Sequence, residues 1–77
     1  MPGNPQALAE LAGKTMYERD PASQALGMTL DVIRPGYARM RMRVREDMLN
    51  GHGTCHGGYI FMLADSAFAF ACNSHNL

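Results

Sequence analysis

The 77-residue sequence has no excess charge of either sign, since seven basic residues balance seven acidic ones. A general nucleic-acid-binding domain is usually strongly basic, so this balance argues against that class of protein. Cysteine is also scarce, and Cys55 and Cys72 are too few for a disulfide scaffold. Free thiols fit a reducing compartment, so the sequence predicts a cytoplasmic protein.

Long hydrophobic runs are missing as well. The longest, Tyr59–Cys72, has 14 residues and contains an acid, so it is too short to span a bilayer and we expect no contact with membranes. The N-terminus, MPGNPQALAE, lacks a basic segment followed by an apolar run, so we expect no signal peptide. A hydrophobic fraction of 47% in so short a chain is typical of one small globular domain.

The N-terminal segment predicts a helix. Asn4 followed by Pro5 is a typical helix start, with an N-cap and a proline at the first helical position. The residue before a proline is disfavoured in the helical conformation, so the helix should end before Asp20-Pro21. We therefore expect residues 1–22 to form an N-terminal helix and a linker.

The next segment predicts a β-hairpin within residues 23–47. Apolar and polar residues alternate over Leu26–Ile33 and again over Tyr37–Glu46, and Pro35-Gly36 between them suits a tight turn. One face should be apolar and need a cover, and the other should be polar. The apolar face carries Leu26, Met28, Leu30, Val32, Ala38, Met40, Met42 and Val44, and the polar face of the second strand carries Arg39, Arg41, Arg43 and Arg45.

Residues 48–77 predict a glycine-rich turn followed by a helix that is apolar on nearly every face. Asp65 and Ser66 are the only markedly polar residues in the apolar run. Other parts of the protein must cover every face of such a helix. A carboxylate within it must either be paired with another group or have a function at a cleft or an interface. Two strands cannot provide that cover, so we expect the sheet to be incomplete in this chain, completed by a larger domain or by another chain.

The start of this helix is a candidate anion site. The first N–H groups of a helix have no partner within it, and Gly57 and Gly58 would let a ligand approach them closely. The simpler alternative is that both glycines only permit a tight turn. Gly57 and Asp65 lie about 12 Å apart along a helix, too far to serve one reacting group. If both are catalytic, Asp65 of one subunit must face Gly57 of another, which predicts a dimer with antiparallel helices.

The run NGHGTCHGGYIFMLADSAFAFACNS, preceded by DPASQALGM and DVIRPGYARMRM, resembles the hotdog-fold acyl-CoA thioesterases. Among these it is most similar to the PaaI type, named for phenylacetate catabolism. The resemblance covers residues 20–76 and implies an α+β hotdog fold, an antiparallel sheet wrapped round a long central helix, of which this chain is the N-terminal part. It also implies a homodimer or homotetramer that hydrolyses acyl-CoA, with aryl- or aryl-acetyl-CoA expected, and no cofactor beyond the coenzyme A of the substrate.

Carried over residue by residue, the resemblance implies specific roles. The backbone N–H of Gly57 polarises the thioester carbonyl, Asn50 orients the carbonyl or the attacking water, and Asp65 of the facing subunit is the nucleophile or general base. His56 borders the substrate carbonyl. Two further residues are expected to contact the substrate: Gly58 and His52.

Other interpretations of these residues are weaker. Two His/Cys pairs could supply zinc ligands, but the helix would hold them about 20 Å apart, so we expect no metal. The glycines around Gly53 lack the Lys and Ser/Thr of a phosphate-binding loop. The arginines could meet phosphates of coenzyme A or nucleic acid, although a solvated strand face is the simpler interpretation. The two pairs are His52 with Cys55 and Cys72 with His75.

The alternative function is a hotdog domain without catalysis. Such a domain would bind acyl-CoA or serve only in assembly. The presence of Asn50, Gly57 and Asp65 together favours the enzyme. We therefore expect a thioesterase, and ligand binding without hydrolysis would favour the alternative.

Overall fold

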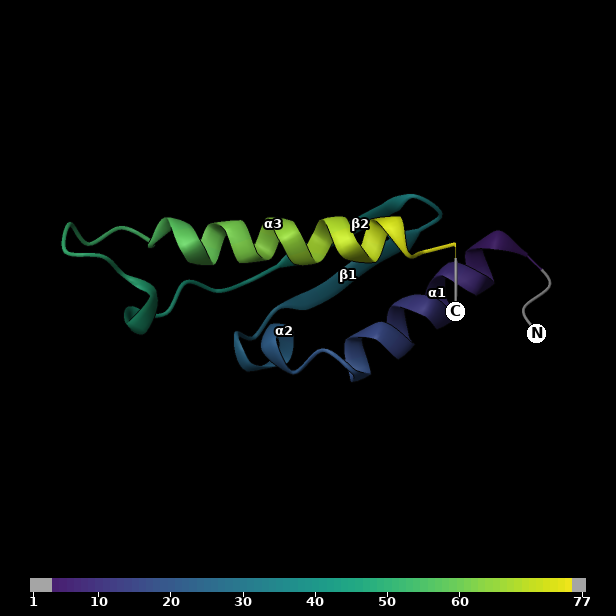
Figure 1. The fold of residues 1–77 in the computed structure, drawn as a ribbon, viewed down its shortest axis with the longest axis horizontal. Coiled ribbons are helices and arrows are strands. Elements are labelled where there is room, and N and C mark those ends of the chain that lie inside the picture. The colour runs from purple at the N-terminus through teal and green to yellow at the C-terminus, as the bar shows by residue number, and fades with distance from the viewer. Residues whose placement is uncertain (1–3, 76–77) are drawn as a thin grey trace.

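The computed structural model describes residues 4–75, which form three α-helices, a β-hairpin and a short 3-10 helix. The elements follow one another as α1 (Pro5–Glu18), α2 (Pro21–Ala25), β1 (Thr29–Arg34), β2 (Tyr37–Arg41), η1 (Glu46–Met48) and α3 (Gly57–Cys72). The hairpin lies between α1 and α3, and the segment between β2 and α3 extends beyond the hairpin at one end of the molecule (Figure 1). This arrangement confirms the predicted α+β class.

Helix α1 begins and ends where the sequence predicts. The side chain of Asn4 accepts a hydrogen bond of 2.7 Å from the N–H of Ala7, and Pro5 occupies the first helical position. The helix approaches β1 closely, because a Cβ atom at Gly13 would lie only 3.0 Å from Leu30 Cδ2. A larger residue at Gly13 would require the side chains of Leu30 and Ile33 to shift.

Helix α2 replaces most of the expected linker and the first residues of the predicted hairpin. Asp20 caps it by accepting from the N–H of Ser23 at 3.0 Å, and Pro21 follows at the first helical position. The Asp-Pro pair therefore ends one helix and starts another. Leu26 then caps α2, and Gly27 turns the chain with a φ of +71°. The prediction that these two residues belong to a strand was wrong.

The hairpin and its turn are confirmed, but the strands are shorter than predicted. Strands β1 and β2 pair antiparallel, and Gly36 adopts a φ of +74° in the turn. A bulge between Leu30 and Val32 shifts the register, so that Ile33 lies opposite Ala38 and packs towards the core. The prediction that Val32 shares that face was wrong, because simple alternation cannot anticipate the extra residue of a bulge.

Strand β2 ends at Arg41, opposite the first residue of β1. The prediction of a strand up to Glu46 was wrong, because within residues 4–75 no strand pairs with the chain beyond Arg41. Val44, expected on the apolar face, is 48% exposed. Met40 is buried and Met42 packs against the core, as predicted.

The core lies between the hairpin and α3. Its buried residues are Met28, Met40 and Phe70, and the ring of Tyr17 from α1 lies 6.5 Å from that of Phe70. The hydroxyl of Tyr17 donates a hydrogen bond of 2.6 Å to the carbonyl of Met28. Helix α3 thus covers the apolar face of β2, as predicted, and α1 covers the part of that face on β1.

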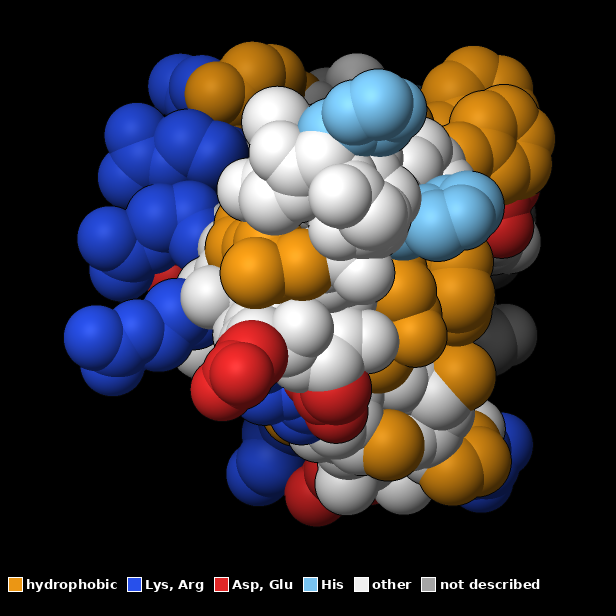
Figure 2. Space-filling view, turned by 90° about the vertical axis from the view of Figure 1, so that its left-hand side faces the viewer, with side chains coloured by type: hydrophobic (Ala, Val, Ile, Leu, Met, Phe, Trp, Pro, Cys, Tyr) orange, Lys and Arg blue, Asp and Glu red, His pale blue; other side chains and the backbone are white. Residues whose placement is uncertain are grey.

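The hairpin covers only one face of α3. On the other face Ile60, Phe61 and Phe68 are 57%, 71% and 70% exposed. Hydrophobic side chains gather on one side of the molecule and basic side chains on the opposite side (Figure 2). Among the described residues, no helix has both the length and the hydropathy needed to cross a bilayer.

Candidate active site

The loop before α3 is closed on itself by backbone hydrogen bonds. Leu49 and Cys55 form an isolated antiparallel bridge, and the N–H of Asn50 donates to the carbonyl of Thr54 at 2.8 Å. The N–H of His56 donates to the carbonyl of Met48 at 2.7 Å, and Met48 is fully buried. These bonds join the two ends of the loop to each other directly before the first turn of α3.

The Asn50 side chain organises this loop. Its Oδ1 accepts from the N–H of His52 at 2.9 Å and of Thr54 at 3.2 Å, and its Nδ2 donates to Thr54 Oγ1 at 2.9 Å. Asparagine commonly bonds the backbone two residues on in this way. In the structure Asn50 stabilises its own loop, a role that the sequence analysis did not predict.

Replacing Asn50 with Ala should make the loop before α3 more mobile. Two backbone N–H groups would lose their acceptor, and the free energy of unfolding should fall by about 1–3 kcal/mol. Amide hydrogen exchange at His52 and Thr54 should accelerate, while exchange in α1 should stay as in wild type. Unchanged exchange at both amides would contradict this role of Asn50.

The N-terminus of α3 is open. No side chain caps it, and within residues 4–75 neither Gly57 nor Gly58 donates a backbone hydrogen bond to another residue. A Cβ atom at Gly57 would meet nothing within 4 Å, and one at Gly58 would meet only His56 Nδ1, at 4.0 Å. Both N–H groups are thus accessible to a ligand, in the position where the helix dipole favours negative charge.

Asp65 lies on the exposed face of α3, two turns further along. Phe61 and Phe68, at positions four before and three after it, share this face and are largely exposed. At a rise of about 1.5 Å per residue, Asp65 and Gly57 are about 12 Å apart along the helix. Within this chain the structure therefore does not bring these two residues together.

The histidines of the loop are exposed. His52 lies at the loop tip, and His56 caps α3 through its backbone with φ −62° and ψ 132°. Histidine side chains are visible at this end of the molecule (Figure 2). His56 directly precedes the open N–H groups, whereas Cys72 and His75 lie at the far end of α3. Among residues 4–75 no three His, Cys, Asp or Glu side chains cluster as metal ligands do.

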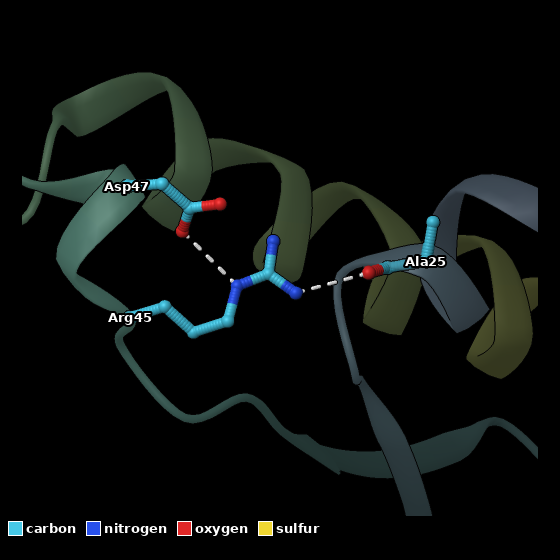
Figure 3. A network of polar contacts seen from close by, with 3 residues as sticks. All are labelled: Ala25, Arg45 and Asp47. Carbon is cyan, nitrogen blue, oxygen red and sulfur yellow. Dashed lines mark hydrogen bonds and ion pairs between the residues drawn. The ribbon is translucent and has the colours of Figure 1, made fainter.

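Arg45 anchors the segment that leads into the loop. Its guanidinium donates to Asp47 Oδ1 and to the carbonyl of Ala25, both at 3.1 Å (Figure 3). The second bond satisfies a carbonyl at the C-terminus of α2. The arginine therefore links η1 to the C-terminus of α2.

The other arginines of the predicted polar face are exposed. Arg41 forms an ion pair with Asp31, the residue of the β1 bulge. A hydrogen bond from Thr29, followed by the contact with Arg41, holds the pKa of the Asp31 carboxyl below its ordinary value, against an opposing effect of burial. This face therefore has the solvated character that the sequence favoured.

No family model matches the sequence, but several curated proteins are similar over most of it, two of them over more than three quarters of its length. The acyl-coenzyme A thioesterase PaaI of Escherichia coli is 52% identical over 62 residues, which cover 80% of this chain and 44% of that protein. A protein described as a putative esterase of Archaeoglobus fulgidus is 45% identical over 60 residues, which cover 78% of this chain and 39% of that protein.

Solved structures are similar as well, and two of them are of PaaI proteins. The PaaI protein from the phenylacetic acid degradation operon of E. coli matches 96% of this chain and 54% of its own, with a TM-score of 0.93 and 44% identity. A mutant of the phenylacetic acid degradation protein PaaI from Thermus thermophilus matches 75% of this chain and 50% of its own, with a TM-score of 0.71 and 46% identity.

The chain spans about half the length of the relatives it matches. Over that span, the structural similarity confirms the predicted hotdog fold, with a long helix against antiparallel strands. The remainder of such a domain lies outside the part compared.

Proposed function

Because this chain is a homologue of the PaaI-type acyl-CoA thioesterases and spans about half of their length, we propose that the intact protein hydrolyses acyl-CoA thioesters at a site shared by two subunits. Residues 1–77 would then be the N-terminal part of one hotdog domain. The observation that supports this most is the pairing of an open helix N-terminus at Gly57 with a carboxylate, Asp65, on an exposed apolar face.

The chemistry follows from these two groups. The thioester carbonyl oxygen accepts a hydrogen bond from the N–H of Gly57, and the helix dipole stabilises the negative charge that develops there. Asp65 either removes a proton from the attacking water or attacks the carbonyl carbon itself, and water then hydrolyses the anhydride. The carbon–sulfur bond breaks, the coenzyme A thiolate leaves and takes up a proton, and a carboxylic acid remains.

The site requires a second copy of the chain. Asp65 and Gly57 of one helix are about 12 Å apart, whereas catalytic groups act within about 3 Å of the reacting atoms. Two α3 helices packed antiparallel through their exposed faces would bring Asp65 of one copy to Gly57 of the other. Such packing would also remove Phe61 and Phe68 from water, which favours association. The assembly is a homodimer, or a homotetramer made of two such dimers.

The neighbouring residues have supporting roles in this proposal. The N–H of Gly58 is a second donor to the carbonyl oxygen, and exposed His56 borders the carbonyl. Asn50 orients the carbonyl or the water from its fixed loop, and His52 at the loop tip contacts the substrate. No cofactor takes part, since coenzyme A enters as part of the substrate.

An aryl-acetyl thioester is the proposed substrate. The descriptions of two relatives name phenylacetic acid degradation. Phe61 and Phe68 lie on the same face of α3 as Asp65, so at the interface between two copies they would offer aromatic contacts to such an acyl group. The free thiols of Cys55 and Cys72 fit a cytoplasmic location.

Steady-state kinetics of the intact protein test this proposal. Phenylacetyl-CoA should be hydrolysed with release of one free thiol per turnover, and with a higher kcat/KM than a straight-chain acyl-CoA. The proposal would be contradicted if the nonhydrolysable thioether analogue raised the melting temperature while the thioester released no thiol. That result would favour the alternative, a hotdog domain that binds acyl-CoA without hydrolysing it.

A further inference from the structure

We propose that a partly buried chain of hydrogen bonds through Asp20, Ser23 and Ser66 fixes the rotation and register of α3 and so positions Asp65 for the reaction. Ser66 is a positioning residue in this inference, which rests on the proposed function. The chain joins α2 to the middle of α3, two elements 43 residues apart in sequence.

The chain of bonds has a defined direction. Ser23 is only 1% exposed, and its hydroxyl donates to Asp20 Oδ2 at 2.6 Å. Ser66 Oγ lies 2.9 Å from Ser23 Oγ. Because the single hydroxyl proton of Ser23 is engaged with Asp20, Ser66 must be the donor to Ser23. The position of the Ser66 hydroxyl is therefore set by α2, whose own first turn Asp20 caps.

The position of Ser66 determines that of Asp65. Successive residues of a helix differ by about 100° in direction and 1.5 Å in height. Ser66 faces α2, and Asp65 faces the exposed side of α3. A rotation or slide of α3 that lengthened the Ser23–Ser66 bond would displace the carboxylate as well.

The apolar contacts of α3 cannot supply this precision. Met62, Leu63 and Ala67 of the same helix pack against the core, but apolar attraction is non-directional. Within residues 4–75, the other polar bonds between this helix and the rest of the chain lie near the ends of α3. His56 is bound to Met48 at the start, and buried Ser74 accepts from the N–H of Gly36 at 2.7 Å near the end.

Ser74 provides a matched control for Ser66. Both are serines of the α3 segment whose hydroxyls bind another element, Ser66 at Ser23 and Ser74 at Gly36. Ser74 lies just past the last residue of α3, Cys72, which is itself about 10 Å from Asp65 along the helix axis. A purely structural role predicts similar consequences for the loss of either hydroxyl, whereas a positioning role predicts a loss of turnover only at Ser66.

The experiment compares variants of the intact protein with phenylacetyl-CoA. Ser66→Ala should lower kcat about tenfold to a hundredfold, the range expected for a misplaced catalytic group, with KM within about twofold of wild type. Ser66→Thr, which keeps the hydroxyl, should restore most of kcat. Ser74→Ala should lower the melting temperature and leave kcat within about twofold of wild type. If Ser66→Ala fails to fold, Ser66→Cys, a weaker donor of similar size, takes its place.

Ser23→Ala should reproduce the loss of kcat, and the double variant Ser23→Ala/Ser66→Ala should lose no more than either single variant, because one chain of bonds is broken in all three. A kcat for Ser66→Ala equal to that of Ser74→Ala would overturn the inference. If Asp65→Asn is inactive while Ser66→Ala is normal, only the positioning role fails. If Asp65→Asn is fully active, the proposed function of Asp65 fails, and the positioning role fails with it.

Discussion

Asp65→Asn should lower kcat by about 10²- to 10⁴-fold, because the amide can neither take the proton from water nor attack the carbonyl. The melting temperature should change little, since within residues 4–75 the Asp65 side chain makes neither an ion pair nor a hydrogen bond. The measurement is thiol release from phenylacetyl-CoA at saturating substrate, together with a thermal melt of each protein.

The matched control is Glu18→Gln, which removes an exposed acid from the end of α1, outside the proposed site. Its kcat should equal that of wild type, so a general effect of net charge can be separated from the loss of the catalytic carboxylate. If Asp65→Asn retains turnover within twofold of the Glu18→Gln control, Asp65 is neither nucleophile nor base.

Gly57→Pro should lower kcat by about 10²- to 10³-fold, the usual cost of losing one oxyanion donor. Proline lacks the backbone N–H that the proposal assigns to the thioester carbonyl. The fold should tolerate the change, because proline is favoured at the first position of a helix and His56 has a ψ of 132°, which suits the residue before proline.

Gly57→Ala is the control for this variant. It keeps the N–H, and its Cβ would meet nothing within 4 Å in the chain. Its kcat should exceed that of Gly57→Pro by at least about tenfold, since the two variants differ chiefly in the donor. Melting temperatures of both should be close to wild type. Equal kcat values for the alanine and proline variants would show that the N–H of Gly57 does not serve the carbonyl.

Local signals in the sequence were sufficient for several elements. Asn4-Pro5 and Pro35-Gly36 carry their own capping and turn chemistry, so the start of α1 and the hairpin turn were predicted where they occur. The strand ends were not, because they depend on the partner strand. Val44 continues the alternation of β2 but has no strand beside it within residues 4–75, and the bulge at Asp31 reversed the roles of Val32 and Ile33.

The candidate site was predictable only where it depends on local spacing in the sequence. The spacing of Gly57 and Asp65 along one helix already implied that they cannot meet in one chain, and the structure places them accordingly. The interactions that hold the site's elements in place are tertiary. Neither the bond between Ser23 and Ser66 nor that between Arg45 and Ala25 has a signature in local sequence.

The most direct test of the shared site is a mixed dimer of two inactive variants. One subunit carries Asp65→Asn and the other Gly57→Pro, each with a different tag, and the mixed dimer is purified through both tags. In such a dimer one site has an intact Gly57 and an intact Asp65 from opposite subunits, so turnover per dimer should recover to about half of wild type. Turnover no higher than that of the two parent variants would contradict a site built across the dimer interface.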